Sequence, residues 1–254
     1  MTNETVVYGL GELHLRTLLE RMNEVYKCEV VTRAPKIAYR ETITAPAEGH
    51  HRHKKQSGGA GQFGEVFLKI EPLPRGAGFE FVDHVKGGTI PTQFIPAVEK
   101  GVRSALDSGV IAGYPVKDVR VIVYDGKSHS VDSKDIAFAT AGRKAFIDAV
   151  TKARPIVLEP IVKIEIAAPE HSMGDITGDL SSKRGQVSGT QALPGSRMVV
   201  NGQVPLSELN GYQARLNGMT GGQGRYAIEL SHYDPVPPAV QTGLMGQYKV
   251  KDDD

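Results

Sequence analysis

The sequence IVKIEIA at residues 161–167 opens the segment that decides the fold class of the second half of the chain. Its apolar residues alternate, which indicates a strand, and apolar residues three and four apart follow, which indicates a helix. The two periods continue through SMGDITGDLSS (172–182), QVSGTQAL (186–193), RMVVNGQV (197–204), a helical stretch at 206–219 and RYAIELSHY (225–233). The order β-α-β-β-α-β predicts a two-layer α/β sandwich with both helices on one face of the sheet.

The residues before this segment predict a second domain that also mixes strands and helices. The expected strands lie at 36–44, 64–71 and 116–124, and the expected helices at 92–108 and 133–152. Asp132-Ser133 is suited to cap the second of these helices. At the N-terminus, a helix at 11–26 and a short strand at 27–32 are too few elements to close a core. We therefore expect this piece to be the tail of a further domain.

The composition is that of an ordinary globular protein. Of the 254 residues, 40% are apolar and 23% are charged, and the formal net charge is +1. This mix is typical of folded domains. No apolar run is long enough for a membrane span. The single cysteine, Cys28, excludes an internal disulfide and a cysteine-built zinc site, so we expect a reducing, cytoplasmic compartment. Nothing in the pattern predicts an oligomer, and a monomer is expected.

The motifs of the common catalytic classes are absent from the sequence. It contains no G-x-x-x-x-G-K-[ST] loop for nucleotide phosphates, no G-x-S-x-G nucleophile elbow and no H-E-x-x-H zinc helix. In the run His50–His53, strand alternation places only His51 and His53 on one face, beside a lysine pair that repels cations. No metal site is therefore expected. Asp175 and Asp179 share a predicted helix face, which we interpret as its polar outer side. The sequence predicts no enzyme activity for this chain.

Two loops are predicted at one end of the first domain. Residues 49–64 hold no acidic residue, and their glycine-rich centre is expected to form a hairpin tip at 57–63. Glycine leaves backbone N–H groups open to close approach by a phosphate backbone, and the Gln62 side chain offers both a donor and an acceptor. A second loop, 126–131, precedes a helix at the same end. From the residues alone, ordinary tight turns remain the alternative interpretation.

These loops carry a family resemblance. Residues 56–64, QSGGAGQFG, resemble the Q-S-G-G-x-G-Q-[YF]-G motif in the fourth domain of elongation factor G, and residues 129–133, HSVDS, resemble that domain's second tip loop. GLGELHL at 9–15 is similar to the end of the third domain. Residues 173–185 and 205–212 are similar to the two helices of the fifth. The matches follow one another in order and with matching spacing over nearly the whole chain.

The resemblance implies a division into domains and a fold for each. Residues 1–34 would be a remnant of the third, ferredoxin-like domain. Residues 35–156 would be the fourth domain, a two-layer α/β fold with a left-handed βαβ unit of the ribosomal-protein type, and its tip loops would lie at 57–63 and 126–131. Residues 157–254 would be the fifth domain, ferredoxin-like with a short C-terminal helix. The expected fold class is α/β (α+β).

A function follows from the same resemblance. It implies the ribosome-binding arm of a translational GTPase, whose tip reaches the decoding centre and promotes movement of tRNA and mRNA during protein synthesis. GTP and Mg are then expected only in an N-terminal domain outside this sequence, with no cofactor in the chain itself. The implied partners are the rRNA of both subunits, tRNA, mRNA and ribosomal proteins.

The resemblance assigns site residues position by position. It places the RNA-binding residues of the tip loops at Lys54, Lys55, Gly58, Gly59, Gly61, Gln62, Lys127 and His129. Lys183 and Arg184 fall where the fifth domain faces large-subunit rRNA. No catalytic residue and no metal ligand is implied for this chain.

The sequence also departs from the family motif. Ala60 stands where an arginine is common and Glu65 where a histidine is common, and a less cationic loop weakens contacts to a phosphate backbone. Two functions therefore stay open: translocation of tRNA and mRNA, or the work of a divergent paralogue in ribosome protection, recycling or regulation. A small-molecule kinase is disfavoured, because residues 89–92 lack a glycine-serine loop that binds phosphate at a helix N-terminus.

Overall fold

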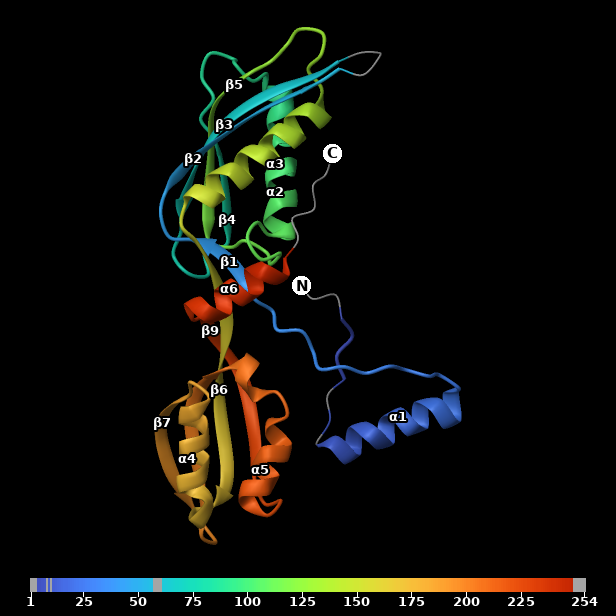
Figure 1. The fold of residues 1–254 in the computed structure, drawn as a ribbon, viewed down its shortest axis with the longest axis vertical. Coiled ribbons are helices and arrows are strands. Elements are labelled where there is room, and N and C mark those ends of the chain that lie inside the picture. Colours follow the sequence, from blue (N-terminus) through green and yellow to red (C-terminus); the bar gives the residue numbers. More distant parts are fainter. Residues whose placement is uncertain (1–3, 8, 10, 57–60, 249–254) are drawn as a thin grey trace. The chain divides into compact units, whose positions relative to one another are not determined.

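The computed structural model describes residues 4–7, 9, 11–56 and 61–248, and these form two compact units (Figure 1). The tip unit comprises Tyr39–Leu158 together with the segment from Pro235 onward. The sandwich unit comprises Glu159–Asp234 together with the residues before Tyr39. The described strands form a five-stranded and a four-stranded sheet, and both units contain helices, so the α+β class predicted from the sequence is confirmed.

The tip unit is built on a four-stranded sheet with the order β2-β3-β5-β4. Its strands are β2 (Ala47–Lys55), β3 (Gln62–Pro72), β4 (Phe79–Asp83) and β5 (Val119–Lys127). β3 runs antiparallel to both β2 and β5, whereas β4 runs parallel to β5. A parallel pair needs a long crossover, which here contains a 3-10 turn (Thr92–Phe94) and helix α2 (Ile95–Ser108).

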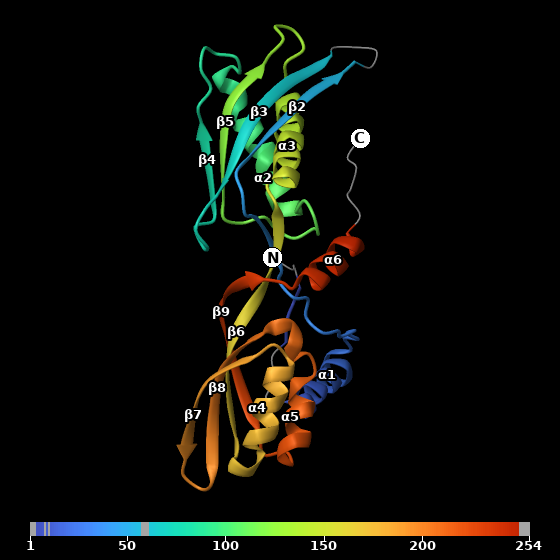
Figure 2. The same cartoon turned by 60° about the vertical axis from the view of Figure 1, so that its left-hand side comes forward.

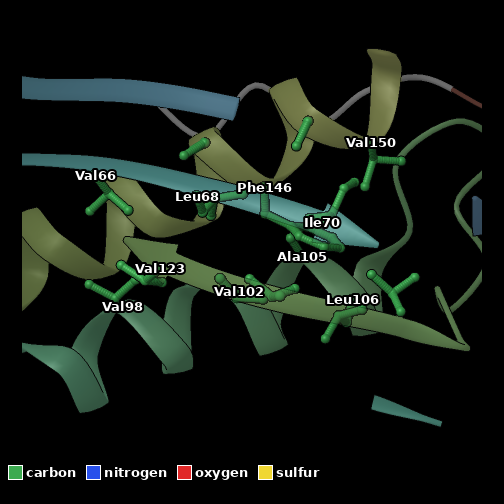
Figure 3. Packing of buried hydrophobic residues seen from close by; sticks show 14 of the residues in the cluster. Val66, Leu68, Ile70, Val98, Val102, Ala105, Leu106, Val123, Phe146 and Val150 are labelled. Carbon is green, nitrogen blue, oxygen red and sulfur yellow. The ribbon is translucent and has the colours of Figure 1, made fainter. Parts of the chain in front are cut away.

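Helix α3 (Asp135–Lys152) follows β5 and packs with α2 on the same face of the sheet (Figure 2). Strand residues alternate between the two faces, and on β3 the buried set Val66, Leu68 and Ile70 points towards the helices (Figure 3). From α2, Val98 and Val102 enter the same core. The other face of this sheet carries none of the core residues named here.

Glycines let the backbone of α3 come unusually close to its neighbours. A Cβ added to Gly49 on β2 would lie 2.1 Å from the carbonyl oxygen of Ala145, and one added to Gly101 on α2 would lie 1.9 Å from that of Ala139. Real Cβ atoms do not approach this closely, so neither position accepts a larger residue without movement of the helix. The helix spacing is therefore encoded by these glycines.

A buried carboxylate organises the base of the tip unit. Glu41 lies on β1 (Arg40–Ile43), which pairs antiparallel with the start of β6 (Pro155–Pro169), and it is 0% exposed. Its Oε2 accepts hydrogen bonds from the backbone N–H groups of Val110 (2.7 Å) and Ile111 (3.0 Å). Its Oε1 accepts those of Ala112 (2.8 Å) and Tyr114 (3.0 Å). Four backbone dipoles thus stabilise the charge, and the charge fixes the loop after α2.

The sandwich unit has the β-α-β-β-α-β order predicted from the sequence. After β6 come α4 (Met173–Ser182), β7 (Gln186–Leu193), β8 (Arg197–Pro205), α5 (Tyr212–Thr220) and β9 (Arg225–Pro235). β6 lies between β8 and β9, and β7 is the neighbour of β8. Alternate residues of β6, among them Val162, Ile164 and Ile166, meet the apolar sides of both helices in one core.

Several local predictions are wrong. The strand expected at 36–44 forms only as β1, which pairs with β6, and the helix expected at 206–219 is a 3-10 turn followed by α5. Helix α1 (Glu12–Tyr26) is present, but residues 27–32 form no strand, because a strand needs a partner and none pairs with this segment in the part of the chain described. Asp132-Ser133 does not cap α3, whose N-cap is Lys134 with no side-chain cap bond. Asp179 is not on a polar outer face. It is 6% exposed and accepts a hydrogen bond from Arg215.

The C-terminal helix α6 (Pro238–Gln247) packs with the tip unit. Val240 and Leu244 lie against the buried residues Ala112, Val157 and Val236. This grouping by contact differs from the sequence boundary at 156/157, so the division into domains stays a prediction. None of the helices in the described ranges is long and apolar enough to cross a membrane.

A matched pair of glycine substitutions tests the helix spacing. Alanine is favoured over glycine within a helix by about 1 kcal/mol, yet we expect Gly101→Ala to lower the free energy of unfolding by about 1–3 kcal/mol, since the new methyl group meets the Ala139 carbonyl. Gly178→Ala on α4 has nothing within 4 Å and should be neutral or stabilising. Thermal unfolding followed by circular dichroism measures both, and equal effects would contradict the assigned spacing.

Substitution of Glu41 tests the buried carboxylate. Glu41→Gln replaces an acceptor oxygen by an amide NH₂ that faces backbone donors, so we expect the free energy of unfolding to fall by about 3 kcal/mol. Glu80→Gln, which breaks a surface pair with Arg120, should change it by less than about 1 kcal/mol. Urea-induced unfolding monitored by circular dichroism gives both values. A Glu41→Gln protein as stable as the parent would show that the loop is held in another way.

Candidate nucleic-acid interface

The β2–β3 hairpin fixes the first of the two predicted tip loops. Its register places Lys55 opposite Gln62 and Lys54 opposite Phe63 at the end of the ladder. Gly58 and Gly59, both predicted RNA-binding residues, lie outside the described residues. Gly61 is described and buried. A Cβ there would lie 2.9 Å from the carboxylate of Asp132, so this glycine permits close approach of the second loop.

Backbone and hydroxyl hydrogen bonds hold the second loop against the hairpin. The N–H of Phe63 donates to the carbonyl of Asp132 (2.9 Å), and Ser133 Oγ donates to the carbonyl of Phe63 (3.1 Å). β5 extends through Lys127, which lies opposite Glu65 on β3. The turn that follows β5 thus begins later than the sequence indicated. The described parts of both loops therefore lie at one end of the tip unit.

The His129 side chain stabilises the turn that contains it. Its N–H donates to Ser133 Oγ (2.8 Å), and its Nδ1 accepts from the N–H groups of Val131 (3.3 Å) and Asp132 (3.2 Å). With Nδ1 as an acceptor, the neutral ring carries its proton on Nε2, which makes Nε2 a donor. The ring lies 6.2 Å from that of Phe63 and tilts by 59° against it. The same side chain thus shapes the loop and keeps a donor for a ligand.

A hollow of about 260 Å³ lies where the two loops meet. Cationic and amide side chains dominate its walls, and one carboxylate, that of Asp132, is among them. The residues around it are Arg52, Lys54, Lys55, Gln56, Gly61, Gln62, Phe63, His129 and Asp132. Of the predicted tip residues that the structure describes, all except Lys127 line this hollow. An anionic ligand with hydrogen-bonding edges suits such a lining.

Glu65 partly offsets the positive charge behind the tip. This carboxylate is 6% exposed and contacts His50 Nε2 (2.9 Å) and Arg52 Nε (3.5 Å). The Arg52 guanidinium lies 5.5 Å from the ring centre of Phe63, within the range of a cation–π contact. The sequence identified Glu65 only as a departure from the motif, and Arg52 and Phe63 were not among the predicted site residues. Extending the hairpin register back from its tip pairs Arg52 with Glu65, and that signal was sufficient to find the contact.

The remaining histidines of β2 face the helix side. Burial lowers the pKa of His51 below its ordinary value, and the nearby Lys144 and the neighbouring histidines lower it further. His53 Nε2 lies 3.1 Å from Gln62 Oε1, so it orients the amide that the sequence assigned to RNA. Within the described ranges, no group of three or more histidine, cysteine or acidic side chains is arranged to hold a metal ion.

Lys183 and Arg184 lie in the sandwich unit, where both have internal partners. Arg184 adopts a left-handed backbone conformation (φ 59°), and its guanidinium donates to both carboxylate oxygens of Glu159 and to Glu208 Oε1 (2.9 Å). The bond to Glu159, which is 1% exposed, raises the pKa of Arg184 above its ordinary value. Lys183 Nζ donates to the carbonyl of Glu208 (3.2 Å). Their contact with rRNA stays a prediction.

Comparison with known proteins gives a consistent assignment. The family model described as elongation factor G, domain IV, matches residues 35–154, and that described as elongation factor G C-terminus matches residues 156–244. Elongation factor G of Aquifex pyrophilus is 48% identical over 246 residues, which cover 97% of this chain and 35% of that protein. An elongation factor G-like protein of Thermotoga maritima is 47% identical, with 96% and 36% covered.

A solved structure supports the same assignment. A protein from Thermus thermophilus superposes with a TM-score of 0.80 at 42% identity, over 94% of this chain and 35% of that one. The two matched domains define the class as a translational elongation factor. The chain belongs to the elongation factor G family, of which it holds domain IV and the C-terminal domain. It spans about a third of the length of the relatives named here.

The lowered pKa of His51 predicts a loss of stability in mild acid. The unfolded state protonates His51 more readily than the folded state does. The contribution of neutral His51 to the free energy of unfolding is therefore complete above the ordinary histidine pKa of about 6.5, and it is lost as the pH falls through the lower folded-state pKa. The parent should therefore lose more stability on acidification than His51→Gln. Urea unfolding on both sides of that pKa measures the difference, with His84→Gln as an exposed control. Equal losses in the parent and His51→Gln would contradict the burial effect.

Proposed function

We propose that this chain is the ribosome-binding arm of an elongation-factor-G-like translational GTPase, which inserts its tip near the decoding centre to promote translocation of tRNA and mRNA. The observation that carries the proposal is the junction of the two loops at Phe63, which brings Lys54, Lys55, Gln62 and His129 around one hollow. Membership of the family supports the same role.

The tip has the properties that such a role requires. Lysine ammonium groups bind phosphates as point charges, while the amide of Gln62 and the Nε2 of His129 supply directional hydrogen bonds to a ribose or a base edge. The described ends of both loops join strands or α3 and are held together by the hydrogen bonds of Phe63, which suits the tip to act as a steric wedge. Lys127, exposed on β5 behind the second loop, adds charge outside the hollow.

The rest of the machinery belongs to the longer protein that we infer. GTP and Mg would bind in an N-terminal domain of that protein, with no cofactor in the two domains described. Lys183 would contact large-subunit rRNA from the sandwich unit. Arg184 would contact it only through guanidinium N–H groups that do not already donate to Glu159 or Glu208. The protein would act in the cytoplasm as a monomer.

A divergent paralogue is the second candidate. The observation that favours it is Glu65, whose buried carboxylate offsets the charge of Arg52 immediately behind the tip. A weaker cationic tip suits ribosome protection, recycling or regulation as well as it suits translocation. Expression of the full-length parent in cells depleted of their own elongation factor G separates the two candidates, because only a translocase restores growth.

Tip substitutions in the full-length parent test the arm directly. We expect Gln62→Ala and His129→Asn each to slow single-round translocation by about tenfold, the loss associated with one or two directional contacts of about 1.4 kcal/mol in total. Asparagine is chosen at position 129 because its Oδ1 can replace Nδ1 as acceptor for the turn, while the Nε2 donor is lost. Rapid-mixing measurement of mRNA movement on programmed ribosomes gives the rates.

A control variant and a footprint complete the test. Lys100→Ala removes an exposed charge on α2 away from the hollow and should leave the rate unchanged. Chemical footprinting with the isolated chain should show protection at the decoding centre and at the large-subunit factor site. Unchanged rates for both tip variants, or protection spread evenly over the rRNA, would refute the wedge role.

A further inference from the structure

The face of the tip-unit sheet opposite the helices carries a row of aromatic rings. On β3, the residues that alternate with the buried Val66 and Leu68 include Phe63 and Phe67, and both are half-buried. The ring of His50 on β2 stacks on Phe67 with centroids 4.1 Å apart and planes 19° apart. Because side chains opposite one another in adjacent strands share a face, these rings line the open face.

A β-bulge in β5 brings a third aromatic ring next to these two. The register of β3 against β5 shifts between Phe67 and Leu68, from Asp125 to Val123, so Tyr124 is the extra residue. Bulges redirect a side chain and are frequent beside functional sites. The Tyr124 ring lies 6.4 Å from Phe67 at 48°, and its hydroxyl donates to Glu48 at 3.4 Å. Three rings from β2, β3 and β5 therefore stand side by side across the sheet.

Charge on this face changes along the strands. Towards the tip it carries Arg52, Lys54 and Lys127, and its carboxylates there are the exposed Asp125 and the buried Glu65, which contacts Arg52. At the other end the cations are neutralised in pairs: Lys69 with Glu71 (2.8 Å) and Arg120 with Glu80 (2.7 Å). Glu48 is a further carboxylate at that end, so cations outnumber carboxylates only in the half towards the tip, which is continuous with the hollow at the loops.

We propose that this open face binds single-stranded RNA, with bases stacked on the aromatic row and phosphates held by the three cations. Aromatic rings on the face of a four-stranded sheet, flanked by basic side chains, suit unpaired bases, whose π-faces are accessible. A duplex hides those faces and offers only its backbone. Phe63 and Phe67 are four residues apart, or about 13 Å along the strand, so the strand of RNA would cross more than one ring.

The inference goes beyond the arm proposal, which concerns the loops at the tip. It assigns a second surface of the same unit to RNA, and it is open to test without ribosomes. If RNA bases do not stack on the sheet, the slowed translocation expected of the Gln62 and His129 variants is unaffected. If those variants translocate at the parent's rate, binding of RNA to the sheet is equally unaffected.

Binding of a labelled oligouridine of about eight nucleotides to the whole chain tests the proposal by fluorescence anisotropy. We expect Phe67→Leu and Tyr124→Leu each to raise Kd by about tenfold, the loss of one stacked base. Tyr124→Phe keeps the ring and should bind as the parent does. Tyr26→Leu, on an exposed ring of α1, serves as the matched control and should have no effect. Circular dichroism confirms that each variant is folded.

Salt dependence and crosslinking locate the bound strand. Three phosphate contacts to a single strand give a slope of log K against log salt of about −2, and Lys127→Ala should reduce its magnitude by about 0.7. Irradiation of a bromouridine oligomer should attach it to peptides containing Phe67 or Tyr124. Parent-like affinity in both leucine variants, equal affinity for a duplex of the same length, crosslinks confined to residues outside the sheet, or no detectable binding would each overturn the proposal.

Discussion

The close approach of α3 to the sheet and to α2 is the constraint on which the tip unit depends. Glycines at Gly49 and Gly101 leave no room for a Cβ, so the helix backbone rests directly on its neighbours. Once α3 is placed, its N-terminal end sets where the second loop meets β3, and the hydrogen bonds of Phe63 with Asp132 and Ser133 follow. Within the described residues, α2 and α3 both pack on one face of the sheet, and neither covers the opposite face. Backbone spacing in the core thus determines both surfaces that we assign to RNA.

Buried carboxylates perform a second, separate task in both units. Glu41 is satisfied by four backbone N–H groups, whereas Glu159 is satisfied by a guanidinium with a hydroxyl, Ser207 Oγ at 3.2 Å. In each case a buried carboxylate accepts hydrogen bonds from a neighbouring loop and so fixes a loop conformation that apolar packing alone does not specify. Glu65 differs, because its partners His50 and Arg52 belong to the candidate interface. It therefore lowers the net charge of that surface while holding the Arg52 guanidinium and the His50 ring in place.

Much of the architecture was predictable from local pattern. The alternation in β6 and β8 and the helical spacing in α2 and α4 are strong because one face of each element is buried and the other is not. The segment 27–32 has the same apolar character and forms no strand, since pairing depends on a partner that pattern does not supply. Asp179 was misplaced for a related reason: its burial depends on Arg215, which is distant in sequence and close only in the fold.

By itself the sequence determined the β-α-β-β-α-β order of the sandwich unit and the two long helices of the tip unit, because these depend on periodicity, but it did not predict β4 or separate β1 from β2. Only the tertiary structure decided which side chains share a surface. The pairing of Arg52 with Glu65, the junction of Phe63 with Ser133 and the aromatic row through Tyr124 each join separate strands or loops. The row depends in addition on a register shift of one residue in β5. Such a shift moves a side chain from one face to the other, and no period in the sequence records it.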